Sequence, residues 1–203
     1  MATHRKKKRR GLPASAKAAI ALISLALVVG LVLGGSRIIK DFSTRRTFPL
    51  KYDHIILEQA RERDLDPSLV AGVIWAESGY RPAVTSSAGA VGLMQITPDT
   101  AAWIAGKLAL DPESLDLTDP QTNITLGCWY LRFLADKFSG QLPELLAAYN
   151  AGHNKVAQWL QDPAYSADGQ HLTEIPYKET DAYVDKVQRA QQVYRDFYHL
   201  GQS

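Results

Sequence analysis

One run of sequence, Leu69-Val-Ala-Gly-Val-Ile-Trp-Ala-Glu-Ser78, decides the fold, and it is followed by Gly92-Leu-Met-Gln95. The run is apolar up to its last two residues, which predicts a buried helix that ends in a carboxylic acid. A turn of small residues, 85–92, can fold back towards that end. Glu77 then lies in apolar surroundings, where desolvation disfavours the carboxylate and keeps the carboxyl protonated nearer neutral pH. A protonated carboxyl is what a general acid requires.

The pattern around this run is helical, which predicts an all-α fold. Asp66 is placed to cap the helix that Pro67 begins, because a proline at the first helical position loses no hydrogen bond. The buried stripe of this helix is expected to comprise Leu69, Val70, Val73 and Ile74. Further helices are expected around Ile55–Ala60, from Pro98 to Ile104, from Pro120 to Leu134, and over 142–149, 154–160 and 179–198. A loop is expected at 161–176, and the sequence contains no clear alternating strand pattern and no internal repeat.

The basic and acidic residues are divided between two parts of the chain. The whole chain has a net charge of +2, but residues 1–51 carry 12 lysines and arginines and one acid, and so a charge of +11. Residues 52–203 carry 11 basic and 20 acidic residues, and so a charge of −9. An acidic folded part argues against nucleic acid as a ligand. The single cysteine, Cys128, excludes an intramolecular disulfide and a multi-cysteine metal site.

The N-terminal part predicts a membrane anchor. Residues 18–35 contain no charged side chain and have nearly the minimum length for a bilayer span. The basic flank before them favours a cytoplasmic N-terminus. We therefore expect a single-pass protein of the cell membrane, with a basic cytoplasmic tail at 1–17, a transmembrane helix at 18–35, a polar tether at 36–51 and an extracytoplasmic domain at 52–198. A cleaved signal peptide is the alternative, but Gly34-Gly-Ser-Arg37 is a poor cleavage site.

Five short motifs occur in one order along the expected domain. They are Glu77-Ser78, the stretch from Ser86 to Gln95, Asn123-Ile with Gly127 and Tyr130-Leu131, Ala148-Tyr-Asn-Ala-Gly152, and Glu179-Thr with Tyr183-Val184. In this combination the chain resembles the catalytic domain of the soluble lytic transglycosylase family over residues 52–198. The resemblance implies a lysozyme-like (goose-type) helical domain behind the N-terminal transmembrane helix.

The resemblance also implies cleavage of the MurNAc–GlcNAc β-1,4 bond in peptidoglycan glycan strands, which leaves a 1,6-anhydro-MurNAc end. Carried over, Glu77 is the catalytic acid and then the base; the alternative is an ordinary surface glutamate at a helix end. No Asp or Glu lies between Glu77 and Asp99, whereas ordinary glycosidases use two carboxylates. The 2-acetamido oxygen of MurNAc can replace the second carboxylate by stabilising the oxocarbenium-like centre. No metal and no cofactor is expected.

Seven further residues match family positions that contact or support the substrate cleft. They are Ser86, Met94, Gln95, Tyr149, Asn150, Glu179 and Tyr183. Each has a plainer interpretation, because Ser86 can simply form a turn and Met94 can be a core residue. Tyr149 can be a packing aromatic, and Glu179 can be an acid favoured at a helix N-terminus. Cys128 is expected to be a buried small apolar residue.

Two other functions stay open at the level of sequence. A hydrolytic muramidase on the same fold would use water in place of the C6 hydroxyl of MurNAc. A noncatalytic glycan-binding scaffold needs no proton donor, so Glu77 within its motif disfavours it. The basic tail favours anionic lipid over nucleic acid, because an apolar span follows it. The machinery of wall synthesis or secretion is a further candidate partner.

Overall fold

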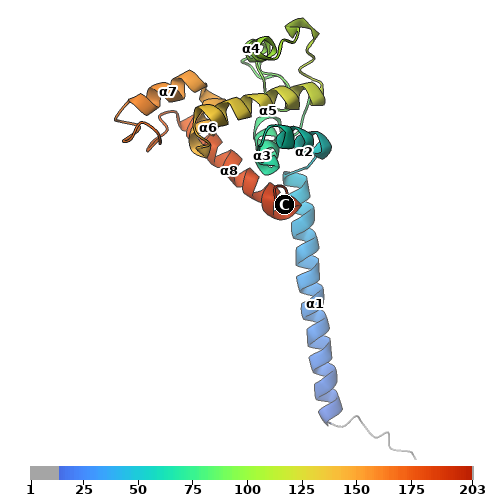
Figure 1. Cartoon of the computed structure of the whole chain (residues 1–203). Helices are drawn as coiled ribbons and strands as arrows, with labels where there is room; N and C mark the ends of the chain where they lie inside the picture. The colour runs from blue at the N-terminus through green and yellow to red at the C-terminus, as the bar shows by residue number, and fades with distance from the viewer. Residues whose placement is uncertain (1–13, 203) are drawn as a thin grey trace, which may run out of the picture. The chain divides into compact units, whose positions relative to one another are not determined.

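The computed structural model describes residues 14–202, without the side chains of residues 14–28 and Leu33. The chain divides into two units, residues 1–47 and residues 48–203 (Figure 1). Within the described residues every regular element is a helix, and the only β-type pairings are isolated bridges from Val91 to Thr85 and Ile96. The prediction of an all-α chain is therefore confirmed.

The first unit contains one helix, α1 (Ala14–Thr47). Most of the expected tail at 1–17 lies outside the described residues, as do most side chains of the expected span at 18–35. Where the structure can be searched, it holds no helix that is long and apolar enough to cross a membrane. The helix runs on to Thr47, so much of the segment expected to be a polar tether is helical.

The second unit contains seven α-helices and one 3-10 helix within its described residues. They are α2 (Asp53–Glu62), α3 (Pro67–Ser78), α4 (Pro98–Leu108), η1 (Pro112–Ser114), α5 (Pro120–Lys137), α6 (Leu142–Ala151), α7 (His153–Gln161) and α8 (Lys178–Tyr198). The expected helices are all present, and η1 is the addition that the sequence pattern did not predict. Aspartate or threonine caps explain three of the starts, because Asp66, Thr97 and Asp119 each accept a hydrogen bond from the first turn that follows.

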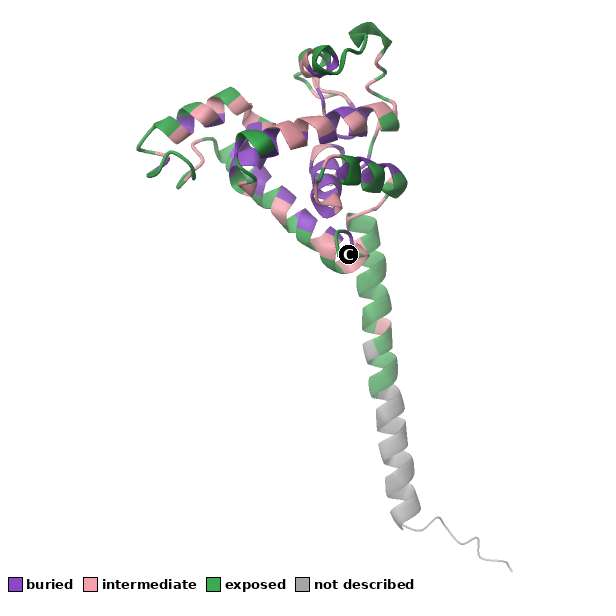
Figure 2. Ribbon diagram, viewed as in Figure 1, coloured by how far each residue is buried: buried purple, intermediate pink, exposed green. Residues whose placement is uncertain are grey.

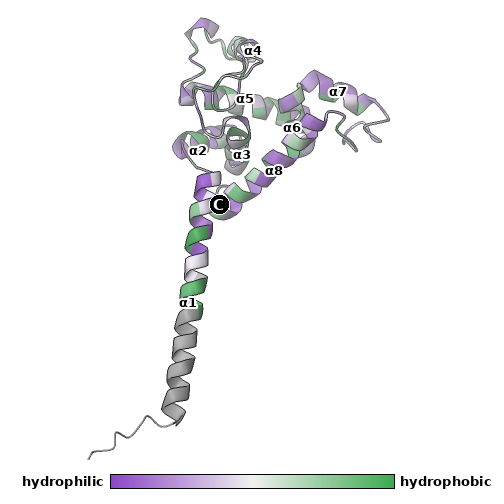
Figure 3. Ribbon diagram, turned by 180° about the vertical axis from the view of Figure 1, so that it is seen from behind, coloured by the Kyte–Doolittle hydropathy of each residue, from purple (hydrophilic) through white to green (hydrophobic). Residues whose placement is uncertain are grey.

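The centre of this unit is α3, which packs against α2 and α8 (Figure 2). Its expected stripe of Leu69, Val70, Val73 and Ile74 is buried, and burial extends around most of the helix. Gly72 allows α8 to approach, because a Cβ there would lie 3.0 Å from the backbone nitrogen of Gln191. The long helix α8 is amphipathic, with hydrophobic and hydrophilic positions alternating along it (Figure 3), and its inner face closes the core over α3.

Asp66 joins the start of α3 to α8. Its carboxylate accepts hydrogen bonds from the Ser68 backbone nitrogen at 2.8 Å and from the Gln191 side chain at 3.1 Å, and it forms an ion pair with Arg195. Burial by itself would raise the pKa of Asp66, but the hydrogen bonds from Ser68 and Arg195 outweigh it and hold the pKa below its ordinary value. Asp66 thus caps α3 and also fixes the packing of α3 against α8.

We expect Asp66→Ala to lower the free energy of unfolding by about 2 kcal/mol at neutral pH, because it removes a cap and two contacts to α8. Asp111→Ala is the matched control, since Asp111 caps only the exposed helix η1. A carboxylate with a lowered folded-state pKa stabilises the fold above its unfolded pKa, so the difference from wild type should shrink as pH falls below the ordinary value of 3.8. Denaturant unfolding at several pH values measures this difference in stability. An equal effect of the Asp66 and Asp111 variants would contradict the proposed role of Asp66.

Candidate active site

The carboxylic acid of the sequence lies at the C-terminal end of α3. Gly79 ends the helix in the left-handed conformation, with φ of 58°, and donates a hydrogen bond to the Trp75 carbonyl at 3.0 Å. The buried hydroxyl of Ser78 donates to the Leu93 carbonyl at 2.8 Å. This hydrogen bond therefore connects the end of α3 to the loop that follows it, next to Glu77.

The loop after α3 is held against α5 by one buried amide. The Asn123 Oδ1 accepts from the Met94 backbone nitrogen at 2.7 Å, and its Nδ2 donates to the carbonyls of Val91 and Leu117 at 2.9 and 2.8 Å. Gly92 makes room for this amide, because a Cβ there would lie 2.2 Å from the Asn123 Nδ2, and its φ of 85° disfavours any other residue. Asn123 and Gly92 together therefore fix the loop against α5.

Met94 is held from two further sides. A Cβ on Gly127 of α5 would lie 2.2 Å from the Met94 sulfur, so glycine is required for the two to pack. The Tyr149 hydroxyl of α6 donates to the Met94 carbonyl at 2.8 Å. The loop, α5 and α6 therefore have fixed positions beside the end of α3.

A direct hydrogen bond connects Glu77 to a side chain of α8. The Tyr183 hydroxyl donates to the Glu77 Oε1 at 2.7 Å, across 106 residues of sequence. Tyr183 is itself buried, and Glu77 is only partly exposed. The acid is thus oriented by a neighbour that donates a hydrogen bond to its carboxylate form.

Burial raises the pKa of Glu77 to about 7, although the hydrogen bond from Tyr183 and the positive charge of Lys186 lower it. Burial, with the nearby Glu77 carboxylate, raises the pKa of both Tyr149 and Tyr183 well above the ordinary value. Both phenols therefore stay neutral. A carboxyl with a pKa near the working pH can donate a proton and take one back.

Two of the predicted site residues have hydroxyl or amide groups that hold the loop itself. The Ser86 hydroxyl accepts from the Ala90 backbone nitrogen at 3.0 Å, in a turn. The Gln95 Nε2 donates to the carbonyls of Val84 and Gly92 at 3.1 and 2.9 Å. Contacts of Ser86 and Gln95 with a substrate remain predictions.

The other predicted residues lie in different surroundings. Met94 is fully buried in the core, as its plainer interpretation requires. Asn150 is exposed, and its Oδ1 accepts from the Thr180 hydroxyl at 2.8 Å. Glu179 is exposed in the first turn of α8, where an acid is favoured by the helix dipole. Their roles towards a substrate also remain predictions.

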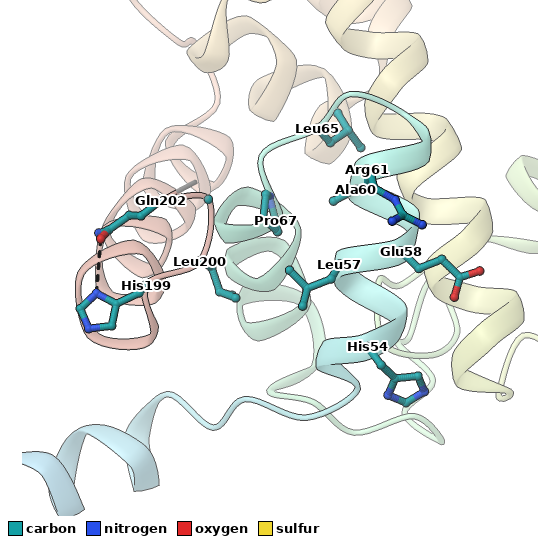
Figure 4. A pocket seen from close by; sticks show the side chains of 11 residues that line it. His54, Leu57, Glu58, Ala60, Arg61, Leu65, Pro67, His199, Leu200 and Gln202 are labelled. Carbon is teal, nitrogen blue, oxygen red and sulfur yellow. Dashed lines mark hydrogen bonds between the residues drawn. The ribbon is translucent and has the colours of Figure 1, made fainter.

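A cavity of about 290 Å³ adjoins the acid's neighbours, and Gln95, Tyr130, Tyr149 and Asn150 contribute to its lining. It brings three predicted substrate-binding residues together. A larger cavity of about 860 Å³ lies between α2 and the C-terminal turn (Figure 4) and contains none of the predicted site residues. The smaller cavity is therefore the better candidate for ligand contact, because of the residues that line it.

Three residues with clear structural roles were not predicted. In the sequence Asn123 occurs only as part of a motif, Thr180 only as the neighbour of Glu179, and Lys186 in none of the motifs. Each acts across a long sequence separation, which periodicity cannot indicate. Cys128 is buried as expected, and burial raises the pKa of its thiol to about 12. Among the described side chains no group of three His, Cys, Asp or Glu could hold a metal ion.

The burial of Glu77 has a cost in stability that pH should reveal. A carboxyl whose folded-state pKa is raised does not change the free energy of unfolding at pH values below its unfolded-state pKa of 4.5. It destabilises the fold increasingly as the pH rises to about 7. We expect Glu77→Gln to be more stable than wild type at about pH 8, by on the order of 3 kcal/mol, and nearly equal to it at about pH 4. Denaturant unfolding measures this, with the exposed Glu179→Gln as control. A Glu77→Gln variant without this pH-dependent gain would contradict the raised pKa.

Comparison with known proteins connects this geometry to a family. The family described as Transglycosylase SLT domain matches residues 54–172. The soluble lytic murein transglycosylase of Salmonella typhimurium is 35% identical over 154 residues, which cover 74% of this chain and 24% of that protein. The membrane-bound lytic murein transglycosylase C of Haemophilus ducreyi is 27% identical over 169 residues, which cover 71% of this chain and 45% of that protein.

Solved structures agree with the sequence relatives. An inactive mutant of the lytic transglycosylase Slt from Pseudomonas aeruginosa, in which glutamine replaces a glutamate, superimposes with a TM-score of 0.66 at 30% identity. The match covers 75% of this chain and 25% of that one. The chain spans about a quarter of the length of the first curated relatives that it matches. With a family match over more than half of its length, the chain belongs to the transglycosylase SLT family.

Proposed function

We propose that the chain is a lytic transglycosylase that cleaves the MurNAc–GlcNAc β-1,4 bond of peptidoglycan and leaves a 1,6-anhydro-MurNAc end. One observation carries the proposal: Glu77 is largely removed from solvent, has a pKa of about 7 and accepts a hydrogen bond from Tyr183. The printed names of the relatives, lytic murein transglycosylases, support the substrate class. The smaller cavity, to whose lining Gln95, Tyr149 and Asn150 contribute, supports a substrate contact at these residues.

The proposed reaction needs one acid that acts twice. Protonated Glu77 gives its proton to the leaving GlcNAc oxygen as the glycosidic bond breaks. The 2-acetamido oxygen of MurNAc stabilises the positive charge that develops at C1. The resulting Glu77 carboxylate then takes the proton of the MurNAc C6 hydroxyl, whose oxygen forms the new bond to C1. No water is consumed, and the acid returns to its protonated form.

A hydrolytic muramidase is the second candidate, because the same acid could activate water in its second step. The intramolecular route is favoured because no Asp or Glu lies between Glu77 and Asp99 in the motif stretch, whereas hydrolases of the usual kind use a second carboxylate. A noncatalytic scaffold is disfavoured, because an acid with a strongly raised pKa is typical of a catalytic site and a scaffold needs no proton donor.

We also propose that residues 18–35 anchor the protein in the cell membrane with the catalytic domain outside the cytoplasm. The uncharged stretch and the basic flank before it support this. Membrane-bound and soluble proteins both occur among the relatives, so the family leaves the question open. Association with wall-synthesis or secretion machinery stays a prediction.

The products of a wall digest test the proposed chemistry. Digestion of purified cell walls should release muropeptides that end in anhydro-MurNAc, which mass spectrometry distinguishes by the missing water. Glu77→Gln should lower turnover by roughly 1000-fold or more, because glutamine cannot donate the proton. Glu58→Gln, at an exposed position on α2 outside the predicted site, is the matched carboxylate control. Products that carry an added water would assign the protein to the hydrolases, and residual cleavage by a folded Glu77→Gln variant would remove Glu77 from the mechanism.

Cell fractionation tests the proposed anchor. The full-length protein should sediment with membranes and resist extraction by high salt, because an apolar span is not released by screening of charge. Protease added to spheroplasts should digest the domain. A shortened soluble product, or a domain that the cell protects from protease, would argue for a cleaved signal peptide or the opposite orientation.

A further inference from the structure

A lysine of α8 reaches the last turn of α3, next to the acid. The Lys186 Nζ donates to the Ala76 carbonyl at 2.6 Å, across 110 residues of sequence. The same ammonium lies 5.4 Å from the centroid of the Trp75 ring. Carbonyls in the last turn of a helix lack partners within the helix, and a cation is favoured at that end. Lys186 therefore supplies a partner where α3 needs one.

The contacted carbonyl belongs to the peptide unit that leads into Glu77. The orientation of the Ala76–Glu77 peptide determines the direction in which the Glu77 side chain leaves the backbone. Tyr183, one turn earlier on α8, holds the carboxyl group of the same residue at 2.7 Å. Two side chains of one helix thus fix the acid, one through its backbone and one through its carboxyl group.

The charged and titratable groups near the carboxyl come from two elements. Tyr149 of α6 and Tyr183 of α8 are both neutral, because burial and the Glu77 carboxylate raise the pKa of each well above its ordinary value. Lys186, also on α8, is the described cation whose charge lowers the pKa of Glu77. Its charge opposes the effect of burial and stabilises the carboxylate that has to accept a proton later in the cycle.

We propose that Lys186 is a positioning residue for Glu77, which fixes the peptide before the acid and stabilises its carboxylate form. The inference rests on the proposed function for its role in turnover. It makes a separate claim about stability, since the charge of Lys186 and the charge of Glu77 must be energetically coupled. A lysine that only caps α3 would show no such coupling.

A double-mutant cycle in the full-length protein in detergent tests the coupling. Lys186→Met is combined with wild-type Glu77 and with Glu77→Gln, and unfolding by denaturant is measured at two pH values. At about pH 8, where Glu77 is ionised, Lys186→Met should shift the unfolding constant about threefold more in the presence of Glu77 than in its absence. At about pH 5, where Glu77 is protonated, the two shifts should be equal. Equal shifts at both pH values would overturn the proposal.

Activity supplies the second readout. Lys186→Met should move the upper limb of the pH profile of kcat/KM to higher pH by about half a unit, because loss of the cation raises the pKa of Glu77. Lys186→Arg should return the limb to its wild-type position, and Lys137→Met, at an exposed site on α5, should leave it unchanged. An unmoved limb in an active Lys186→Met variant would contradict the role in turnover. An inactive wild type would instead contradict the proposed function, and the stability cycle would still decide whether Lys186 acts on Glu77.

Discussion

Desolvation of the Glu77 carboxyl is the constraint on which the site depends. The acid lies in the last turn of an apolar helix that is buried on most sides, so its neighbours offer little stabilisation to a negative charge. The hydrogen bond from Tyr183 and the charge of Lys186 reduce this effect without cancelling it, and the pKa comes to about 7. Stronger stabilisation of the carboxylate would lower the pKa and leave Glu77 ionised near neutral pH. Weaker stabilisation would raise the pKa and leave Glu77 protonated. In neither case could Glu77 both give and accept a proton near neutral pH.

Several residues of the surrounding motifs hold the loop beside Glu77 in place. Asn123, Gly92 and Gly127 bring the loop after α3, α5 and Met94 into close packing that larger residues would prevent. Tyr149 and Ser78 then tie the same loop to α6 and to the end of α3. These motif residues thus fix the loop, α5 and α6 around the end of α3, where Glu77 lies.

Local signals account for what could be predicted from sequence. Helix starts at Pro67, Pro98 and Pro120 were predicted because proline is favoured at the first helical position, and at Pro67 the preceding Asp66 was also expected to cap the helix. The choice between core and cleft for Met94 could not be made, since both surroundings accept a flexible apolar side chain. The contacts of Lys186 with α3 and of Thr180 with Asn150 join distant segments, so no spacing in the sequence indicates them. The helical extension of α1 to Thr47 was missed because polar residues suit a tether and a helix surface equally well.

The protonation state of Glu77 is the central claim, and it can be observed directly. Full-length protein labelled with ¹³C at glutamate carboxyl groups can be titrated by NMR, with the Glu77→Gln spectrum to identify the signal. The account predicts that the Glu77 signal titrates with a midpoint of about 7. A midpoint at the ordinary value of 4.5 would mean that the acid is solvated and carries no proton near neutral pH. That result would contradict the account of the site.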